Sequence, residues 1–226
     1  MHIKTIENLW LTSNGLEALQ KGKTKSSLIG ITQGDLDGAC GPYALMMALI
    51  ASGAISRTDA ENIWHKPIKG TTKLAKELKK LETLLKEGTD NTTLVKLFEA
   101  IQRYFPKHSN LQKLKATEIN DSGNKLIPFL IEQIDHSLPT IIGLDWRGGG
   151  AHWVTVIGYQ KFDERSEYPE RILVLDPQSR QSKISAWNGI LDVHNLEKGK
   201  KPNTYWVENY SNTCSIDSGV QFQLTS

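Results

Sequence analysis

The sequence has few cysteines and no cysteine framework. Its 226 residues include two, Cys40 and Cys214, which lie far apart. Small secreted domains that depend on disulfides carry several closely spaced cysteines, whereas a chain of this length buries a sizeable core without such cross-links. We therefore expect both thiols to be reduced and residues 1–226 to form a single domain.

The chain also lacks an excess of charge of one sign. Its formal net charge is +2 at pH 7, and its lysines and arginines are spread along the sequence. Nucleic-acid-binding domains normally show a basic stripe or block, so this balance argues against a nucleic-acid partner. The sequence has no paired cysteines or histidines at metal-ligand spacing, and we expect no metal and no cofactor.

Long hydrophobic runs are missing. The longest, YALMMALIASGAI at residues 43–55, is shorter than the roughly 20 residues of a membrane-spanning helix. Residues 1–20 contain neither a continuous apolar stretch nor the small-residue cleavage site of a secretory signal. These features predict no membrane association. They also predict a cytoplasmic location, or secretion by a route without a cleaved signal peptide.

The hydrophobic period of the sequence changes near residue 137. Before it, helical spacing predicts helices at residues 43–52, 58–66 (with Thr58 and Glu61 as a capping box), 71–88, 91–105 and 126–138. After it, β-branched segments predict strands at 139–146, 151–160 and 171–178, with weaker candidates at 203–210 and 219–224. This order predicts an α+β fold, with a helical lobe at about 30–137 packed against an antiparallel β-sheet lobe at about 138–226. Residues 55–137 would elaborate the helical lobe.

Cys40 occupies a position that suits a reactive thiol. It precedes Gly41 and Pro42, and proline is tolerated in the first turn of a helix, so the apolar helix should begin here. The unpaired N–H groups and the positive end of the helix dipole favour the thiolate, which is the nucleophilic form. From position alone, a buried structural cysteine explains the residue equally well. Cys214 has no comparable surroundings, and we expect it to be structural.

A nucleophilic thiol requires a base, and His152 is the best candidate. It follows three glycines and begins the apolar strand HWVTVIGY, so packing of that strand would fix the imidazole. A structural histidine at a strand start is the alternative. The other histidines lie at the chain terminus, at helix ends or in polar segments: His2, His65, His108, His136 and His194.

The base in turn requires an orienting group. Asp176 ends the apolar strand RILVLDPQ, and Asp145 ends the strand in GLDWRGGG, so the residues leave both open. Acyl transfer also builds negative charge on the carbonyl oxygen, which N–H donors stabilise. The side-chain amide of Gln33, seven residues before Cys40, and the backbone N–H of Cys40 are candidates for that role.

Together these segments resemble the papain-like cysteine peptidases, in particular their bacteriocin-processing branch. The likeness rests on Gln33, Cys40 within CGP, His152 within AHWVTVIGY and Asp176 within LVLDPQ, which follow in the same order as in that family. It implies a papain-like fold, with the cysteine helix in one lobe and the histidine and aspartate in the other. It also implies Cys40 as nucleophile, His152 as general base and acid, Asp176 rather than Asp145 as orienting carboxylate, and Gln33 as oxyanion donor.

The resulting expectation is a cysteine peptidase that hydrolyses a protein or peptide substrate through a thioester. The same triad supports chemistry on a side-chain amide, as in a deamidase, a transglutaminase-like enzyme or an acyltransferase, and a toxin or effector would fit either. A catalytically dead scaffold used for binding is the third alternative. Substrate identity and oligomeric state stay open.

Overall fold

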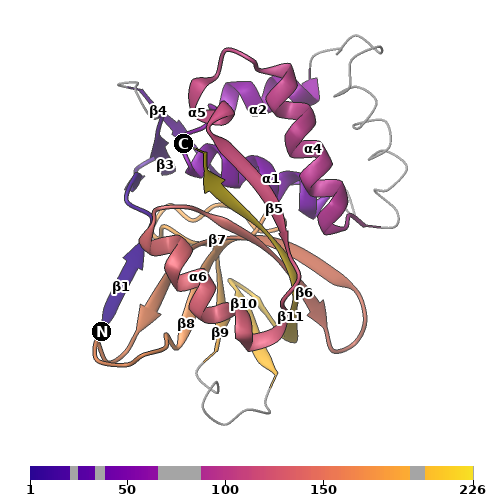
Figure 1. The fold of residues 1–226 in the computed structure, drawn as a ribbon. Helices are drawn as coiled ribbons and strands as arrows, with labels where there is room; N and C mark the ends of the chain where they lie inside the picture. The colour runs from indigo at the N-terminus through magenta and orange to yellow at the C-terminus, as the bar shows by residue number, and fades with distance from the viewer. Residues whose placement is uncertain (21–24, 34–38, 66–87, 194–201, 226) are drawn as a thin grey trace.

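The computed structural model describes residues 1–20, 25–33, 39–65, 88–193 and 202–225, and its main feature is a closed antiparallel barrel (Figure 1). Six strands form it in the order β7-β6-β11-β10-β9-β8, and β8 pairs again with β7. They are β6 (Thr140–Trp146), β7 (Ala151–Lys161), β8 (Arg171–Leu175), β9 (Gly189–Asp192), β10 (Asn203–Val207) and β11 (Tyr210–Leu224).

Two long strands allow the sheet to close. β7 pairs with β6 through residues 151–156 and with β8 through residues 155–160, and its register with β8 shifts between Val156 and Gly158. β11 pairs with both β10 and β6, and its register with β6 shifts between Ile216 and Ser218. Bulges of this kind bend and twist a strand, so the sheet curls onto itself.

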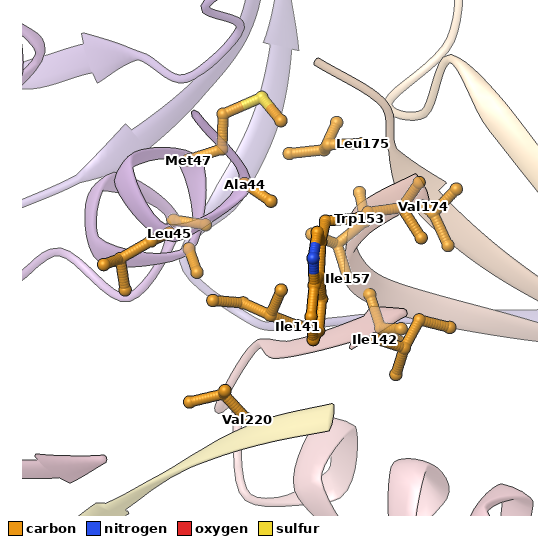
Figure 2. Packing of buried hydrophobic residues seen from close by; sticks show 14 of the residues in the cluster. Ala44, Leu45, Met47, Ile141, Ile142, Trp153, Ile157, Val174, Leu175 and Val220 are labelled. Carbon is orange, nitrogen blue, oxygen red and sulfur yellow. The ribbon is translucent and has the colours of Figure 1, made fainter. Parts of the chain in front are cut away.

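Helix α1 (Cys40–Ala51) packs against the outer face of β7. Eleven of its 12 residues are buried, as expected of a helix that is apolar on every side. Figure 2 shows its residues facing Trp153 and Ile157 of β7. The buried hydroxyl of Thr155 donates a hydrogen bond to the carbonyl of Ala44 over 2.8 Å, which ties the strand to the helix. Because side chains alternate along a strand, Val154 and Val156 point into the barrel.

In the described part of the chain, five further strands lie outside the barrel. β1 (His2–Thr5) pairs with β7, and β5 (Leu114–Ile119) pairs with β11. β2 (Leu9–Thr12), β3 (Gly15–Leu19) and β4 (Ser26–Leu28) form a separate three-stranded sheet. None of these segments shows the long alternation by which a strand is recognised in a sequence, because each is only three to six residues long.

The other helices among the described residues lie on the outside of the barrel and around α1 (Figure 1). They are α2 (Arg57–His65), α4 (Asn91–Tyr104), α5 (Ser109–Gln112), the short η1 (Gly123–Lys125) and α6 (Leu126–Asp135). α4 packs on α1 and β5, and α6 packs on β7. The Asp90 side chain caps α4 by accepting a hydrogen bond from the Thr93 N–H over 2.7 Å.

The start of α2 differs from the expected capping box. Ser56, not Thr58, precedes the helix, and its hydroxyl accepts from the Asp59 N–H over 3.1 Å. Asp59 accepts from the Ser56 N–H over 2.9 Å, which completes a reciprocal pair two residues earlier than expected. Glu61 forms an ion pair with Arg57 instead.

The expected papain-like α+β fold, with a helical lobe packed against a sheet lobe, is wrong. The described residues form a closed six-stranded barrel to which two further strands, β1 and β5, are paired, together with a separate three-stranded sheet and few helices. The prediction failed because alternating hydrophobic spacing identifies a strand but does not show which other strands it pairs with in the sheet. The β7–β8 pairing that closes the barrel depends on bulges and twist, which leave no clear trace in hydrophobic spacing.

The helix expected at residues 71–88 falls almost wholly on residues 66–87, outside the described residues. Within the described part of the chain, no helix is long and apolar enough to cross a membrane.

Candidate active site

Cys40 is the first residue of α1, and its side chain is 6% exposed. The preceding Ala39 provides no side-chain cap, and the first N–H groups of any helix lack acceptors within the helix. The helix is held close to its neighbours here, because a Cβ on Gly41 would overlap the hydroxyl of Thr89. The thiol is therefore fixed at the positive end of a rigid, buried helix.

His152 lies near the start of β7, where its side chain points to the barrel interior while Trp153 points toward α1. It is 5% exposed, its imidazole is hydrogen-bonded to Asp176, and the Cys40 thiol lies near enough to help raise the pKa of the ring. The Nε2 atom lies 2.8 Å from Asp176 Oδ1, so the other ring nitrogen, Nδ1, is the one that can interact with the Cys40 thiol. The structure thus brings Cys40, His152 and Asp176 together.

Asp176 follows the last residue of β8, and three donors hold its buried carboxylate. Oδ1 accepts from His152 and, over 2.7 Å, from the Gln178 N–H, and Oδ2 accepts from the Tyr205 hydroxyl over 2.6 Å. Burial by itself would raise the pKa of this carboxyl. The hydrogen bond and charge of His152, together with the Tyr205 and Gln178 donors, outweigh burial and hold the pKa below its ordinary value.

The same contacts keep the imidazole charged. Burial favours the neutral ring, but the hydrogen bonds and charges of Asp176 and Cys40 prevail and raise the pKa of His152 from 6.5 to about 9. At neutral pH the ring is therefore an imidazolium poised between an acceptor and a thiol. An imidazolium beside a thiol is the arrangement that activates cysteine nucleophiles.

Three residues of this site went unnoticed in the sequence. Tyr205 of β10 donates to Asp176, and Trp146 of β6 stacks on the His152 ring with centroids 6.0 Å apart. Asn188 holds the main chain of Asp176 from both sides, accepting from its N–H over 2.7 Å and donating to its carbonyl over 2.9 Å. Tyr205 lies in a weak strand candidate and Asn188 in an unassigned segment, and only the barrel places them beside Asp176, which is distant in sequence. Trp146 ends a predicted strand, but nothing in the sequence indicates that its ring stacks on His152.

Gln33 lies beside the loop that carries Asp176. Its backbone N–H donates to the Pro177 carbonyl over 2.9 Å, and its side chain is 7% exposed. The side-chain oxygen is buried and accepts no hydrogen bond from the described residues. The structure thus places Gln33 beside the loop that follows Asp176, with its side-chain amide in a buried setting. Its role as oxyanion donor stays a prediction.

The rival carboxylate, Asp145, lies elsewhere. It is exposed on β6 and pairs in register with Ala151, and partial burial and the charge of Asp217 raise its pKa. His108 pairs with Asp59 at 3.2 Å, His136 ends α6, and His2 is on β1. Burial raises the pKa of Cys214 to about 12, as suits an inert thiol.

Two cavities flank the site. The first, the barrel-mouth pocket, holds about 370 Å³ and is lined by His152 and Asp176 themselves with Trp146, Gln178, Ser179, Tyr205, Val207 and Tyr210. The second, the acidic cleft, holds about 330 Å³ and includes Ala151 and Trp153, whose side chains point to the opposite face of β7 from His152. Thr89, which lies against Gly41, and the carboxylates of Asp90, Glu118, Asp145 and Asp217 also line it.

No protein-family model and no curated protein matches the chain. The described residues contain no group of three or more His, Cys, Asp or Glu side chains that could hold a metal ion.

Proposed function

We propose that the protein is a cysteine peptidase that cleaves a peptide bond through a thioester on Cys40. One observation carries the proposal: the buried chain of contacts from Cys40 through His152 to Asp176, with the His152 pKa raised to about 9. It supports nucleophilic catalysis because it supplies a thiol, a base and an orienting carboxylate in one connected array. The motif resemblance to papain-like cysteine peptidases supports the same roles independently of the fold.

The proposed reaction has two balanced steps. The Cys40 thiolate attacks the carbonyl carbon, an S–C bond forms, and the negative charge collects on the oxygen beside the Cys40 N–H and the Gln33 amide. The C–N bond then breaks as His152 gives its proton to the leaving nitrogen. Water next transfers a proton to His152 and its oxygen to the acyl carbon, and the C–S bond breaks to restore the thiolate.

The cavities favour a peptide over a small amide. The barrel-mouth pocket is lined by His152, and the acidic cleft by its two neighbours in β7, Ala151 and Trp153, which point to the opposite face of the strand. An extended chain that crosses the site needs room on both sides, whereas a side-chain amide needs it on one side only. Side-chain amide chemistry is the second candidate, since the same triad performs it. A substrate-binding scaffold without activity is a poorer fit, because competent residues occupy every position of the triad.

The two free thiols suit a reducing compartment. We infer a cytoplasmic protein, or one exported without a cleaved signal peptide, that acts on a protein or peptide partner.

The first test measures the reactivity of Cys40. We expect iodoacetamide to alkylate it at pH 6.5 about tenfold faster in the wild type than in His152→Ala, because the imidazolium stabilises the thiolate. Mass spectrometry of each cysteine peptide gives the rates, and Cys214 is the internal control, since its raised pKa keeps it unreactive. Equal Cys40 rates in the two proteins would refute the triad and leave the binding-scaffold alternative.

A further inference from the structure

The barrel-mouth pocket opens directly on the catalytic groups. The pocket holds about 370 Å³, and the imidazole of His152 and the carboxylate of Asp176 form part of its wall. Whatever occupies it therefore lies against the base during the reaction. No residue of α1 lines the pocket, so it extends from the His152 side of the site and not from the Cys40 side.

The direction of proton transfer assigns this pocket to one half of the substrate. His152 Nε2 is engaged by Asp176, so Nδ1 delivers the proton to the leaving nitrogen. The leaving residue must start within hydrogen-bond reach of that atom. The acyl half stays attached to Cys40 at the start of α1, on the side where Thr89 of the acidic cleft lies against Gly41.

The walls define the chemistry of the occupant. Trp146 and Tyr205 lie with ring centroids 5.6 Å apart, and Val207 and Tyr210 face one another across the β10–β11 hairpin. Tyr210 is 52% exposed and Val207 is half-buried, so both present apolar surface at the opening. The polar contribution comes from the neutral side chains Gln178 and Ser179, from the imidazole of His152, and from Asp176, whose two oxygens are already engaged by donors.

We propose that the barrel-mouth pocket binds an apolar side chain, aromatic or large aliphatic, of the residue that follows the scissile bond. This inference rests on the proposed peptidase activity and names its substrate class on the leaving side. The departing group is then an amine whose nitrogen takes the proton from His152 as the C–N bond breaks. Ammonia released from a side-chain amide carries no side chain that such a pocket could bind.

The test begins with the full-length protein and a peptide library prepared from a digested proteome. Mass spectrometry identifies each new amino terminus and hence the residue that follows every cleaved bond. We expect Phe, Tyr, Trp, Leu and Met to be enriched at that position at least several-fold over their frequency in the library. Cys40→Ala is the blank.

Two exposed aromatic residues of the β10–β11 hairpin provide a matched pair of variants. Tyr210 lines the pocket, whereas Trp206 is 47% exposed and does not line it. For a peptide with Phe after the scissile bond, we expect Tyr210→Ala to lower kcat/KM about tenfold, as for loss of an apolar subsite contact, and Trp206→Ala to leave it unchanged. With Gly at that position, both variants should match the wild type.

The outcomes separate the two proposals. Cleavage by the wild type with no apolar preference after the scissile bond, or equal effects of Tyr210→Ala and Trp206→Ala, overturns the pocket assignment and leaves the peptidase intact. Deamidation of library peptides without new amino termini, or no reaction together with an unactivated Cys40, overturns the proposed function and with it the subsite.

Discussion

At the scale of single residues, the candidate site depends on how the Asp176 carboxylate is held. Its three donors come from β7, from β10 and from the loop after β8, and the pKa of the carboxyl is lowered despite its burial. A carboxylate fixed in this way selects the ring orientation of His152, with Nε2 toward Asp176 and Nδ1 toward Cys40. Tyr205 is thus a positioning residue, since it acts on His152 through Asp176.

Replacing Tyr205 by Phe tests this role. The ring stays packed against Trp146, but Asp176 loses a buried donor, so we expect kcat to fall about tenfold with KM little changed. NMR titration of Asp176 should show its pKa rising toward the ordinary value, because one of the groups that lower it is gone. Tyr104→Phe, which removes the hydroxyl of an exposed tyrosine at the end of α4, is the control. A normal kcat with an unmoved Asp176 pKa would show that Tyr205 is merely structural.

At the scale of elements, the site is the junction of α1 and β7. Cys40 belongs to the helix and His152 to the strand, and the two elements pack through a buried apolar interface (Figure 2). The buried hydroxyl of Thr155 donates a hydrogen bond to the Ala44 carbonyl, one helical turn from Cys40, and so ties the strand to the helix. This contact fixes how far the helix lies along the strand.

Thr155→Val keeps the volume of the side chain and removes that tie. Removing the buried donor should cost about 1–2 kcal/mol, and Tm should fall by several degrees. Because the helix can then shift along β7, the alkylation rate of Cys40 should fall as well. Calorimetry and iodoacetamide labelling measure the two effects. Thr155→Ser retains the hydroxyl, so it should keep the wild-type alkylation rate of Cys40. If that rate falls as much in Thr155→Ser as in Thr155→Val, loss of the hydrogen bond is not the cause.

At the scale of the whole molecule, the charged imidazole links folding to pH. The His152 pKa of about 9 in the folded state lies above its ordinary 6.5, so the proton bound by the folded state stabilises it. This contribution is fully present below pH 6.5 and is lost as the pH rises toward 9. A shift of this size corresponds to about 3 kcal/mol.

We therefore expect the free energy of unfolding to fall between pH 6.5 and pH 8.5. Urea denaturation across this range measures it, and His152→Ala should show a much flatter profile whatever its absolute stability. Cys214 does not interfere, because its pKa is raised to about 12 and its effect lies at higher pH. Cys40→Ser should keep part of the decrease in unfolding free energy with pH, since Asp176 still raises the pKa of His152. A wild-type profile as flat as that of His152→Ala would contradict the raised pKa.

The sequence was informative where a property is local. Helix α1 was predicted from the apolar stretch after Pro42. Strands β6, β7 and β8 were predicted from β-branched segments bounded by glycine, proline or charged residues. Cys40 and His152 were singled out because each lies at the start of such an element, and Asp176 because it ends one and matches the papain-like motif. Short strands such as β1 and β4 were missed because three or four residues do not establish a period.

The sequence by itself determined which side chains could do chemistry and on which kinds of element they stand. Only the tertiary structure decided that the strands close into a barrel, that Asp176 and not Asp145 contacts His152, and that Tyr205, Trp146 and Asn188 complete the site. The physical reason is that hydrophobic period reports which face of an element is buried, whereas strand neighbours, bulges and long-range hydrogen bonds depend on partners distant in the chain.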